Sequence, residues 1–154
     1  MGDIRATDLA SDPRVSEIVI ANRTASRADD LARRIGGRTV NWETAAQTPA
    51  DAYVMALATD AHGDMLNQLL AHGRPILCEK PIALTMADTK KICDSVEQSG
   101  APMQIGFQRR FDAGMARARA MVTRGDLGDI YDMVLASRDH VPPDRNFIPG
   151  SGGI

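Results

Sequence analysis

The stretch GRPILCEKPIALT, residues 73–85, decides the fold class of this chain. Its apolar run, residues 75–79, predicts a short buried strand, and the sequence beyond it predicts a helix. The strand ends on Glu79 and Lys80, and Pro81 follows at once. Proline has no backbone N–H, so strand pairing stops there. A charged pair at the end of a buried strand indicates ionisable groups at the rim of a sheet, where we expect a ligand.

The same alternation of short apolar runs and helical segments extends along the chain in both directions. Strands are predicted at residues 15–21, 38–42, 51–58, 75–79, 102–107 and 129–139. Helices are predicted at residues 2–10, 26–35 with Ser26 as the cap, 62–73, 86–99 after Thr85, and 112–125. Strands that alternate with helices predict an α/β fold with a mostly parallel sheet and right-handed crossovers.

Composition and charge argue against several classes of protein. The chain has 154 residues, about the length of one domain, and 18 Lys and Arg against 20 Asp and Glu give a net charge of −2. This balance gives no reason to expect nucleic acid or a membrane surface as a partner. No apolar run approaches the roughly 20 residues of a membrane helix. Cys78 and Cys93 have no metal-binding spacing, so we expect no metal site and a cytoplasmic protein with reduced thiols.

Polar side chains gather where the predicted strands end. In parallel sheets, ligands bind at the carboxyl ends of the strands. Four successive buried strands are followed by such residues, which makes a stronger signal than any one of them alone. The residues are Asn22 and Arg23, Thr59 and His62, Glu79 and Lys80, and Gln108 and Arg109.

Each of these residues also has a structural interpretation. Lys80 can be a solvated lysine at a strand end, and His62 can be no more than the first residue of a helix. Of Arg109 and Arg110, one can reach the cleft while the other makes a structural ion pair. The sequence alone leaves these alternatives open.

The residues around Lys80 resemble a known family. GRPILCEKPIALT is similar to the Glu-Lys-Pro signature of the Gfo/Idh/MocA oxidoreductases. The resemblance continues in ATDAHGDMLNQLLAHG, residues 58–73, and in IGFQRRFDAGMARARAMVTRGDLGDI, residues 105–130. ASRDHVPPDRNFIPGSGGI, residues 136–154, is most similar to the inositol dehydrogenases of that family.

This resemblance implies an enzyme of two domains that transfers a hydride between NAD(P) and a sugar or cyclitol hydroxyl. Residues 1–108 resemble the Rossmann nucleotide-binding domain, and residues 109–154 the start of an α+β domain for substrate binding and homo-oligomer assembly. Lys80 matches the catalytic lysine, which contacts cofactor and substrate, and Arg109 and Asp139 match substrate-binding segments. The implied cofactor contacts are Gly2, Asn22, Arg23, Thr59, His62, Glu79, Lys80 and Gln108.

The chain also departs from the family pattern. Gly2 resembles the last glycine of the family's G-x-G-x-x-G, and the strand and two glycines that precede it have no counterpart here. We therefore expect a doubly wound sheet that lacks its first strand, between the strands at residues 15–21 and 51–58. Such a chain should be poorly stable unless another chain fills the gap, and inactive as it stands. The alternatives are a non-catalytic nucleotide-binding or dimerising remnant and a non-functional gene fragment.

The end of the strand at residues 15–21 bears on the choice of cofactor. In many Rossmann folds an acidic residue at this point binds the ribose 2′-hydroxyl of NAD. Asn22 stands there instead, and Arg23 can pair with a 2′-phosphate. The sequence therefore slightly favours NADP over NAD, with Arg23 as a solvated loop residue as the alternative.

Overall fold

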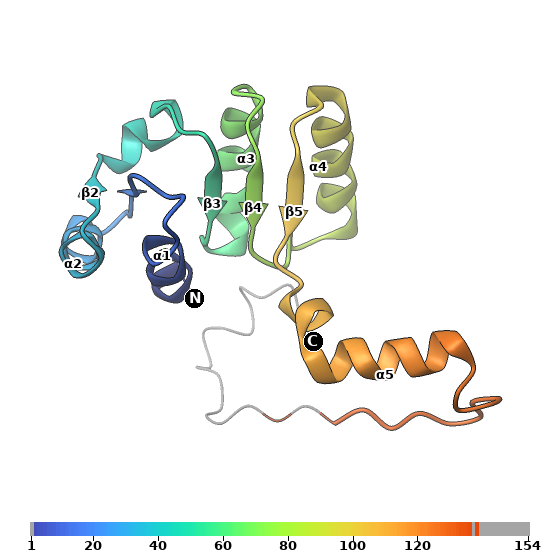
Figure 1. Ribbon diagram of the computed structural model, residues 1–154. Helices are drawn as coiled ribbons and strands as arrows, with labels where there is room; N and C mark the ends of the chain where they lie inside the picture. Colours follow the sequence, from blue (N-terminus) through green and yellow to red (C-terminus); the bar gives the residue numbers. More distant parts are fainter. Residues whose placement is uncertain (1, 137, 139–154) are drawn as a thin grey trace.

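The fold is α/β in the computed structural model, which describes residues 2–136 and 138 (Figure 1). The first half contains α1 (Gly2–Ala10), β1 (Val19–Ile20), α2 (Ala25–Ile35), β2 (Arg38–Thr39), the 3₁₀ helix η1 (Trp42–Gln47) and β3 (Tyr53–Met55). The second half contains η2 (Thr59–Ala61), α3 (His62–Leu70), β4 (Ile76–Cys78), α4 (Met86–Ser99), β5 (Met103–Ile105), η3 (Gln108–Phe111) and α5 (Ala113–Arg124). Among all the residues that the structure describes, no helix is long and apolar enough to cross a membrane.

The strands are parallel, as predicted, but each is shorter than its apolar run. β3, β4 and β5 form one sheet in that order, with Met55 beside Cys78 and Cys78 beside Ile105. β1 and β2 form a second sheet of two strands. The parallel strands and intervening helices confirm the predicted α/β class.

The two sheets are separate at the place where the sequence predicts a missing strand. Within the described residues, β1 pairs only with β2, and β3 pairs only with β4. Parallel neighbours within each sheet are joined by helical crossovers, but among the described residues no strand joins β1 to β3. Figure 1 shows α1 and α2 beside the smaller sheet, and α3 and α4 beside the larger one. The edges of β1 and β3 that face away from their partners therefore carry unpaired backbone groups.

Each sheet has its own apolar core. Beside β1 and β2, the core contains Ile20 and one face of α2, formed by Ala28, Leu31 and Ala32, with Ala6 of α1 packed against it. The larger core lies around β3, β4 and β5, and its buried members are Ala46, Met55, Leu66, Leu69, Leu70, Ile76, Cys78, Ile92 and Ala101. The buried apolar residues are therefore divided in the same way as the strands, into two clusters that share no residue.

Two of the predicted helices differ in how well their ends were foreseen. α4 runs from Met86 to Ser99 with Thr85 as its N-cap and Gly100 as its left-handed C-cap, as predicted. The predicted cap of α2 was wrong, because Thr24 is the N-cap and Ser26 lies inside the helix. The Thr24 side chain makes no capping hydrogen bond. Thr24 and Ser26 are both residue types that favour the N-cap position, so the sequence did not distinguish between them.

The strand predicted at residues 129–139 is absent over the residues that the structure describes there. Residues 129–136 belong to no helix or strand, and residues 137 and 139 lie outside the described part of the chain. Tyr131, Val134 and Leu135 are largely exposed. An alternating apolar run forms a strand only when a neighbouring strand supplies hydrogen bonds and a covered face, and no such neighbour lies beside it in the described residues.

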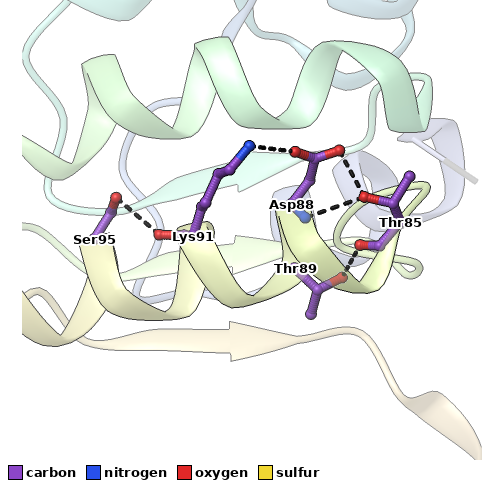
Figure 2. Close-up of polar contacts among 5 residues, drawn as sticks. All are labelled: Thr85, Asp88, Thr89, Lys91 and Ser95. Carbon is purple, nitrogen blue, oxygen red and sulfur yellow. Dashed lines mark hydrogen bonds and ion pairs between the residues drawn. The ribbon is translucent and has the colours of Figure 1, made fainter.

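The start of α4 offers a direct test of local stability. Figure 2 shows that the Thr85 hydroxyl accepts a hydrogen bond from the backbone N–H of Asp88, at 3.1 Å, and donates one to its carboxylate, at 2.7 Å. We expect Thr85→Ala to lower the free energy of unfolding by about 1 kcal/mol, because these N-terminal groups lose their partner. Urea denaturation followed by circular dichroism measures the change.

Ser95 provides a matched control on the same helix. Its hydroxyl donates a hydrogen bond to the carbonyl of Lys91 in the middle of α4, where no cap is needed (Figure 2). Ser95→Ala should be neutral or slightly stabilising, because alanine is the better helix former. An equal loss in both variants would contradict the capping role of Thr85.

Candidate functional site

The carboxyl ends of β3, β4 and β5 lie at one edge of the larger sheet. The register aligns Met55, Cys78 and Ile105 as the last residues of the three strands. The chain beyond each of these residues therefore emerges at the same edge. Glu79 and Lys80 follow β4 directly, and they occupy the middle of this edge.

Glu79 is fixed there by main-chain and side-chain contacts. Its backbone N–H donates to the carbonyl of Met55 at 2.9 Å, which continues the pairing of β4 with β3. Its carboxylate oxygen Oε1 accepts a hydrogen bond from Nε of Arg5 at 2.8 Å, and Nη2 of the same guanidinium forms an ion pair with Oε1, also at 2.8 Å. The Glu79 side chain is only 7% exposed, and that of Arg5 is 30% exposed. A carboxylate so deeply buried requires such a partner.

The second carboxylate oxygen of Glu79 has no such partner. Oε2 is buried and makes no hydrogen bond to the described residues. It lies against Gly106, where a Cβ atom would come within 3.0 Å of it. A side chain at position 106 would therefore require the carboxylate to shift by a few tenths of an ångström. An unpaired buried oxygen is costly for the folded protein, and a bound N–H or O–H group would offset that cost.

Lys80 stands beside this buried carboxylate with a different exposure. Its side chain is exposed to solvent, and the peptide bond from Lys80 to Pro81 is cis. The backbone of Glu79 is held by β3, so Lys80 projects from a fixed point of the edge. The structure thus places an amine where a molecule lying across the strand ends can meet it.

His62 is the first residue of α3 and is almost fully buried, with 1% of its surface exposed. Its ring nitrogens Nδ1 and Nε2 each lie 3.3 Å from a backbone carbonyl, of Ile82 and of Leu57 respectively. The ring therefore ties the loop after β3 to the loop after Lys80. Because both nitrogens face main-chain oxygens and the ring is covered, direct contact with a ligand is not what this geometry provides.

Asn22 and Arg23 follow β1 and belong to the smaller sheet. The Asn22 side chain accepts a hydrogen bond from the backbone N–H of Thr24 at 2.9 Å, which shapes the turn into α2. The Arg23 guanidinium lies 5.4 Å from the ring centroid of Trp42. This cation–π contact gives Arg23 a partner that the sequence did not predict.

The remaining predicted residues are less closely gathered. Gly2 begins α1, Thr59 is half-buried and begins η2, and Gln108 is exposed and begins η3. Arg109 is exposed on η3, while the neighbouring Arg110 guanidinium lies 5.3 Å from the Phe107 ring centroid. Asp139 lies outside the described residues. The structure therefore brings Glu79 and Lys80 together with Gly106 and Arg5.

Cavities and metal ligands do not mark a second site here. A cavity of about 370 Å³ lies at the opposite edge of the sheet, where it is lined by Pro49, Ala50, Asp51, Tyr53, His72 and Arg74. Those residues flank the beginnings of β3 and β4, and no predicted site residue is among them. Across the described residues, no group of three or more His, Cys, Asp or Glu side chains is placed to hold a metal ion.

The two cysteines should react very differently with thiol reagents. Cys78 is fully buried at the end of β4, and burial, with the nearby Glu79 charge, raises the pKa of its thiol to about 11. Cys93 is exposed on α4. A thiolate is the reactive species, so we expect an aromatic disulfide reagent at pH 8 to modify Cys93 rapidly and Cys78 only after unfolding.

The absorbance of the released thiol measures both reactions. Cys93→Ser should remove the rapid phase and leave the slow one, and Cys78→Ser should do the opposite. Rapid modification of Cys78 in the folded protein would contradict this description of the strand end.

The raised pKa of the Cys78 thiol also predicts how stability depends on pH. Above pH 9 the unfolded thiol loses its proton while the folded thiol keeps it up to about pH 11, so the free energy of unfolding should fall with rising pH across this interval.

Arg5 and Gly106 are the members of the site that the sequence did not reveal. Arg5 lies 74 residues before its partner Glu79, and no local pattern connects the two. Gly106 stands in an apolar run that predicted a strand, where a glycine is compatible with close approach of another group. That signal was present in the sequence but did not say which group approaches.

Comparison with known proteins agrees with this arrangement. A family model described as "Oxidoreductase family, NAD-binding Rossmann fold", Gfo/Idh/MocA, matches residues 3–107. The scyllo-inositol 2-dehydrogenase (NAD(+)) of Bacillus subtilis is 30% identical over 149 residues, which are 95% of this chain and 44% of that protein. The chain therefore spans less than half the length of this relative.

Solved structures show the same relationship in three dimensions. A putative myo-inositol dehydrogenase from Sinorhizobium meliloti superposes with a TM-score of 0.88 at 26% identity, over 99% of this chain and 46% of that one. A myo-inositol dehydrogenase from Corynebacterium glutamicum gives 0.84 at 31% identity, again over 99% and 46%. With its Rossmann-type parallel sheets and the family match over two thirds of its length, the chain belongs to the Gfo/Idh/MocA family of oxidoreductases.

Proposed function

We propose that this chain carries the cofactor-binding part of an NAD-dependent oxidoreductase that acts on a CH–OH group of a cyclitol or related sugar. The observation that carries the proposal is the placement of Glu79 and Lys80 at the shared carboxyl edge of β3, β4 and β5. The substrate class follows from the inositol dehydrogenases to which the chain is similar. Because the chain spans less than half of these relatives, the activity of the whole protein is part of the proposal.

Lys80 has the central role in the proposed reaction. Bound NAD supplies the hydride acceptor. The Lys80 amine accepts the proton of the substrate hydroxyl as the carbinol carbon becomes a carbonyl, and Arg109 and Asp139 hold neighbouring hydroxyls of the substrate. An amine at a fixed point of the strand edge suits this role, since a proton acceptor must lie within hydrogen-bond reach of the proton it takes.

The cofactor contacts are distributed over both sheets. Gly2 lies at the N-terminus of α1, where backbone N–H groups favour a phosphate. Thr59, Glu79 and Gln108 line the nicotinamide side of the proposed site. His62 contributes indirectly, by holding the loops that follow β3 and β4.

The nucleotide is proposed to be NAD, in line with the family description and the name of the B. subtilis relative. The preference for NADP predicted from Asn22 and Arg23 finds no support in these comparisons. It stays a prediction, in which Arg23 leaves or shares its contact with Trp42 to meet a 2′-phosphate.

A titration with NADH, and in parallel with NADPH, tests the proposal on the chain itself. Trp42 is the chain's single tryptophan, and its fluorescence reports binding near Arg23. Saturable quenching would support the nucleotide site, and tighter binding of NADPH would support the role of Arg23. Absence of binding by either nucleotide to a sample with a cooperative unfolding transition would overturn the proposed function.

Turnover is proposed to require more of the protein than nucleotide binding does. We place a domain boundary near Gln108, so that residues 1–108 form the nucleotide-binding domain and residues 109–154 begin a substrate domain. Figure 1 shows α5 extending away from the larger sheet, which agrees with such a boundary. We therefore expect no dehydrogenase activity from this chain alone, although it carries Lys80.

A second candidate function is self-association without catalysis. The segment after α5 exposes a run of large apolar side chains, formed by Leu127, Ile130, Tyr131, Met133, Val134 and Leu135. Such a run favours burial against another surface, as in the homo-oligomer that the family resemblance implies. Sedimentation of the chain, with Val134→Ser and Leu135→Ser as disrupting changes, distinguishes association from a monomeric nucleotide-binding domain.

A further inference from the structure

The ion pair between Arg5 and Glu79 connects the two halves of the divided sheet. Arg5 lies on α1, whose Ala6 packs against the core of β1, α2 and β2. Glu79 ends β4 in the middle of the other sheet. The hydrogen bond from Nε of Arg5 and the ion-pair contact of its Nη2 both go to the same oxygen, Oε1, at 2.8 Å. The pair is therefore a charged link between parts that share no strand pairing in the described residues.

The Glu79 carboxylate has a neighbour at each of its two oxygens. Arg5 pairs with Oε1, and Gly106 lies beside Oε2, where a Cβ atom would be 3.0 Å from that oxygen. Without Arg5 the carboxylate would be buried with no hydrogen-bond partner among the described residues, since Oε2 already has none. Removing one member of a buried charge pair leaves the other uncompensated, so Glu79 would have to move toward water. Lys80 is the next residue along the backbone, so any main-chain shift of Glu79 that accompanies this movement would displace Lys80 as well.

We propose that Arg5 is a positioning residue, which sets the place of Glu79 and thereby of Lys80 relative to the N-terminus of α1. The inference rests on the proposed function in assigning Glu79, Lys80 and Gly2 to the cofactor site. It goes beyond that function in coupling the two ends of the site through one side chain. The phosphate end of the cofactor site and its reactive end then keep a fixed separation, even though no strand within residues 2–136 joins the two sheets.

The first experiment compares Arg5→Met with Arg5→Lys and with Arg14→Met. Methionine keeps much of the apolar length of arginine but removes the charge, and lysine restores the charge without the forked geometry. Arg14 makes an exposed ion pair with Asp12 and serves as the matched control. We expect Arg5→Met to weaken NADH binding by about tenfold or more, because the pair is partly buried. Arg5→Lys should recover part of the loss, and Arg14→Met should bind as the unchanged chain does.

A second variant moves Glu79 without touching the charge of Arg5. Gly106→Ala places a methyl group against Oε2, whereas Gly63→Ala meets no atom within 4 Å of its new Cβ and is the control. If Arg5 acts through the position of Glu79, Gly106→Ala should weaken NADH binding as Arg5→Met does. The double variant should then be no weaker than either single one, because both act on one group.

Hydrogen exchange provides a readout that needs no nucleotide. The amide of Glu79 bonds to Met55, and that of Gly106 bonds to Cys78. Arg5→Met should accelerate exchange in residues 76–82 by about tenfold and leave residues 92–99 of α4 unchanged, as expected for local opening. If the unchanged chain binds no nucleotide, the proposed function fails while this exchange still tests the link. Unaltered exchange in residues 76–82, or full NADH affinity in folded Arg5→Met, would overturn the positioning role.

Discussion

Replacing Lys80 by methionine should lower the rate of cyclitol oxidation by about 10²- to 10⁴-fold, the usual contribution of one positioned proton acceptor. Methionine is close to lysine in length and cannot accept a proton. The Lys80 side chain is exposed and follows a backbone segment held by β3, so its loss should leave the fold intact. The affinity for NADH should change much less than the rate, because Glu79 and the N-terminus of α1 remain.

The rate is best measured in a chimaera in which residues 3–107 replace the matching segment of the B. subtilis scyllo-inositol 2-dehydrogenase. Formation of NADH from scyllo-inositol and NAD is followed by absorbance. Lys90→Met is the matched control, since Lys90 is an exposed lysine on α4 and away from the strand ends. Activity of the Lys80→Met chimaera equal to that of the Lys90→Met chimaera would remove Lys80 from the reaction.

The α/β class was predictable from the sequence, because it depends on the alternation of short apolar runs with helical segments, and this alternation is a local pattern. The start and end of α4 were predictable from Thr85 and Gly100, whose capping roles depend on backbone geometry within a few residues. Strand lengths were not predictable in this way. The run at residues 15–21 has strand character throughout, yet only Val19 and Ile20 pair, because pairing needs a neighbour and β2 supplies two residues.

The same distinction applies to the candidate site. Lys80 and Glu79 were found because a charged pair at the end of a buried strand is a local signal. The burial of Glu79 and the exposure of Lys80 could not be predicted in this way. The place of the Glu79 side chain depends on Arg5 and Gly106, which come from distant parts of the chain. For His62 the sequence left two alternatives, and its ring contacts with Leu57 and Ile82 depend on how two loops pack.

Replacing Leu66 by alanine should have the largest effect on stability. Leu66 is completely buried on α3, in the core of the larger sheet. A truncation of this kind removes apolar contacts and leaves a cavity, at a cost of about 2–5 kcal/mol. Whole domains are stable by only about 5–15 kcal/mol, and here the core is divided between two sheets. We therefore expect Leu66→Ala to leave little folded protein at room temperature.

Urea denaturation followed by circular dichroism measures the loss, with two variants for comparison. Leu66→Met nearly conserves volume and should cost less than about 1.5 kcal/mol, so the transition remains observable. Met86 is 83% exposed, and Met86→Ala should change stability by no more than about 0.5 kcal/mol. The unchanged chain, measured alongside, tests the expected poor stability. If Leu66→Ala unfolds at the same urea concentration as the unchanged chain, then the larger sheet is not what holds the fold, and its edge would not be rigid enough to fix Lys80.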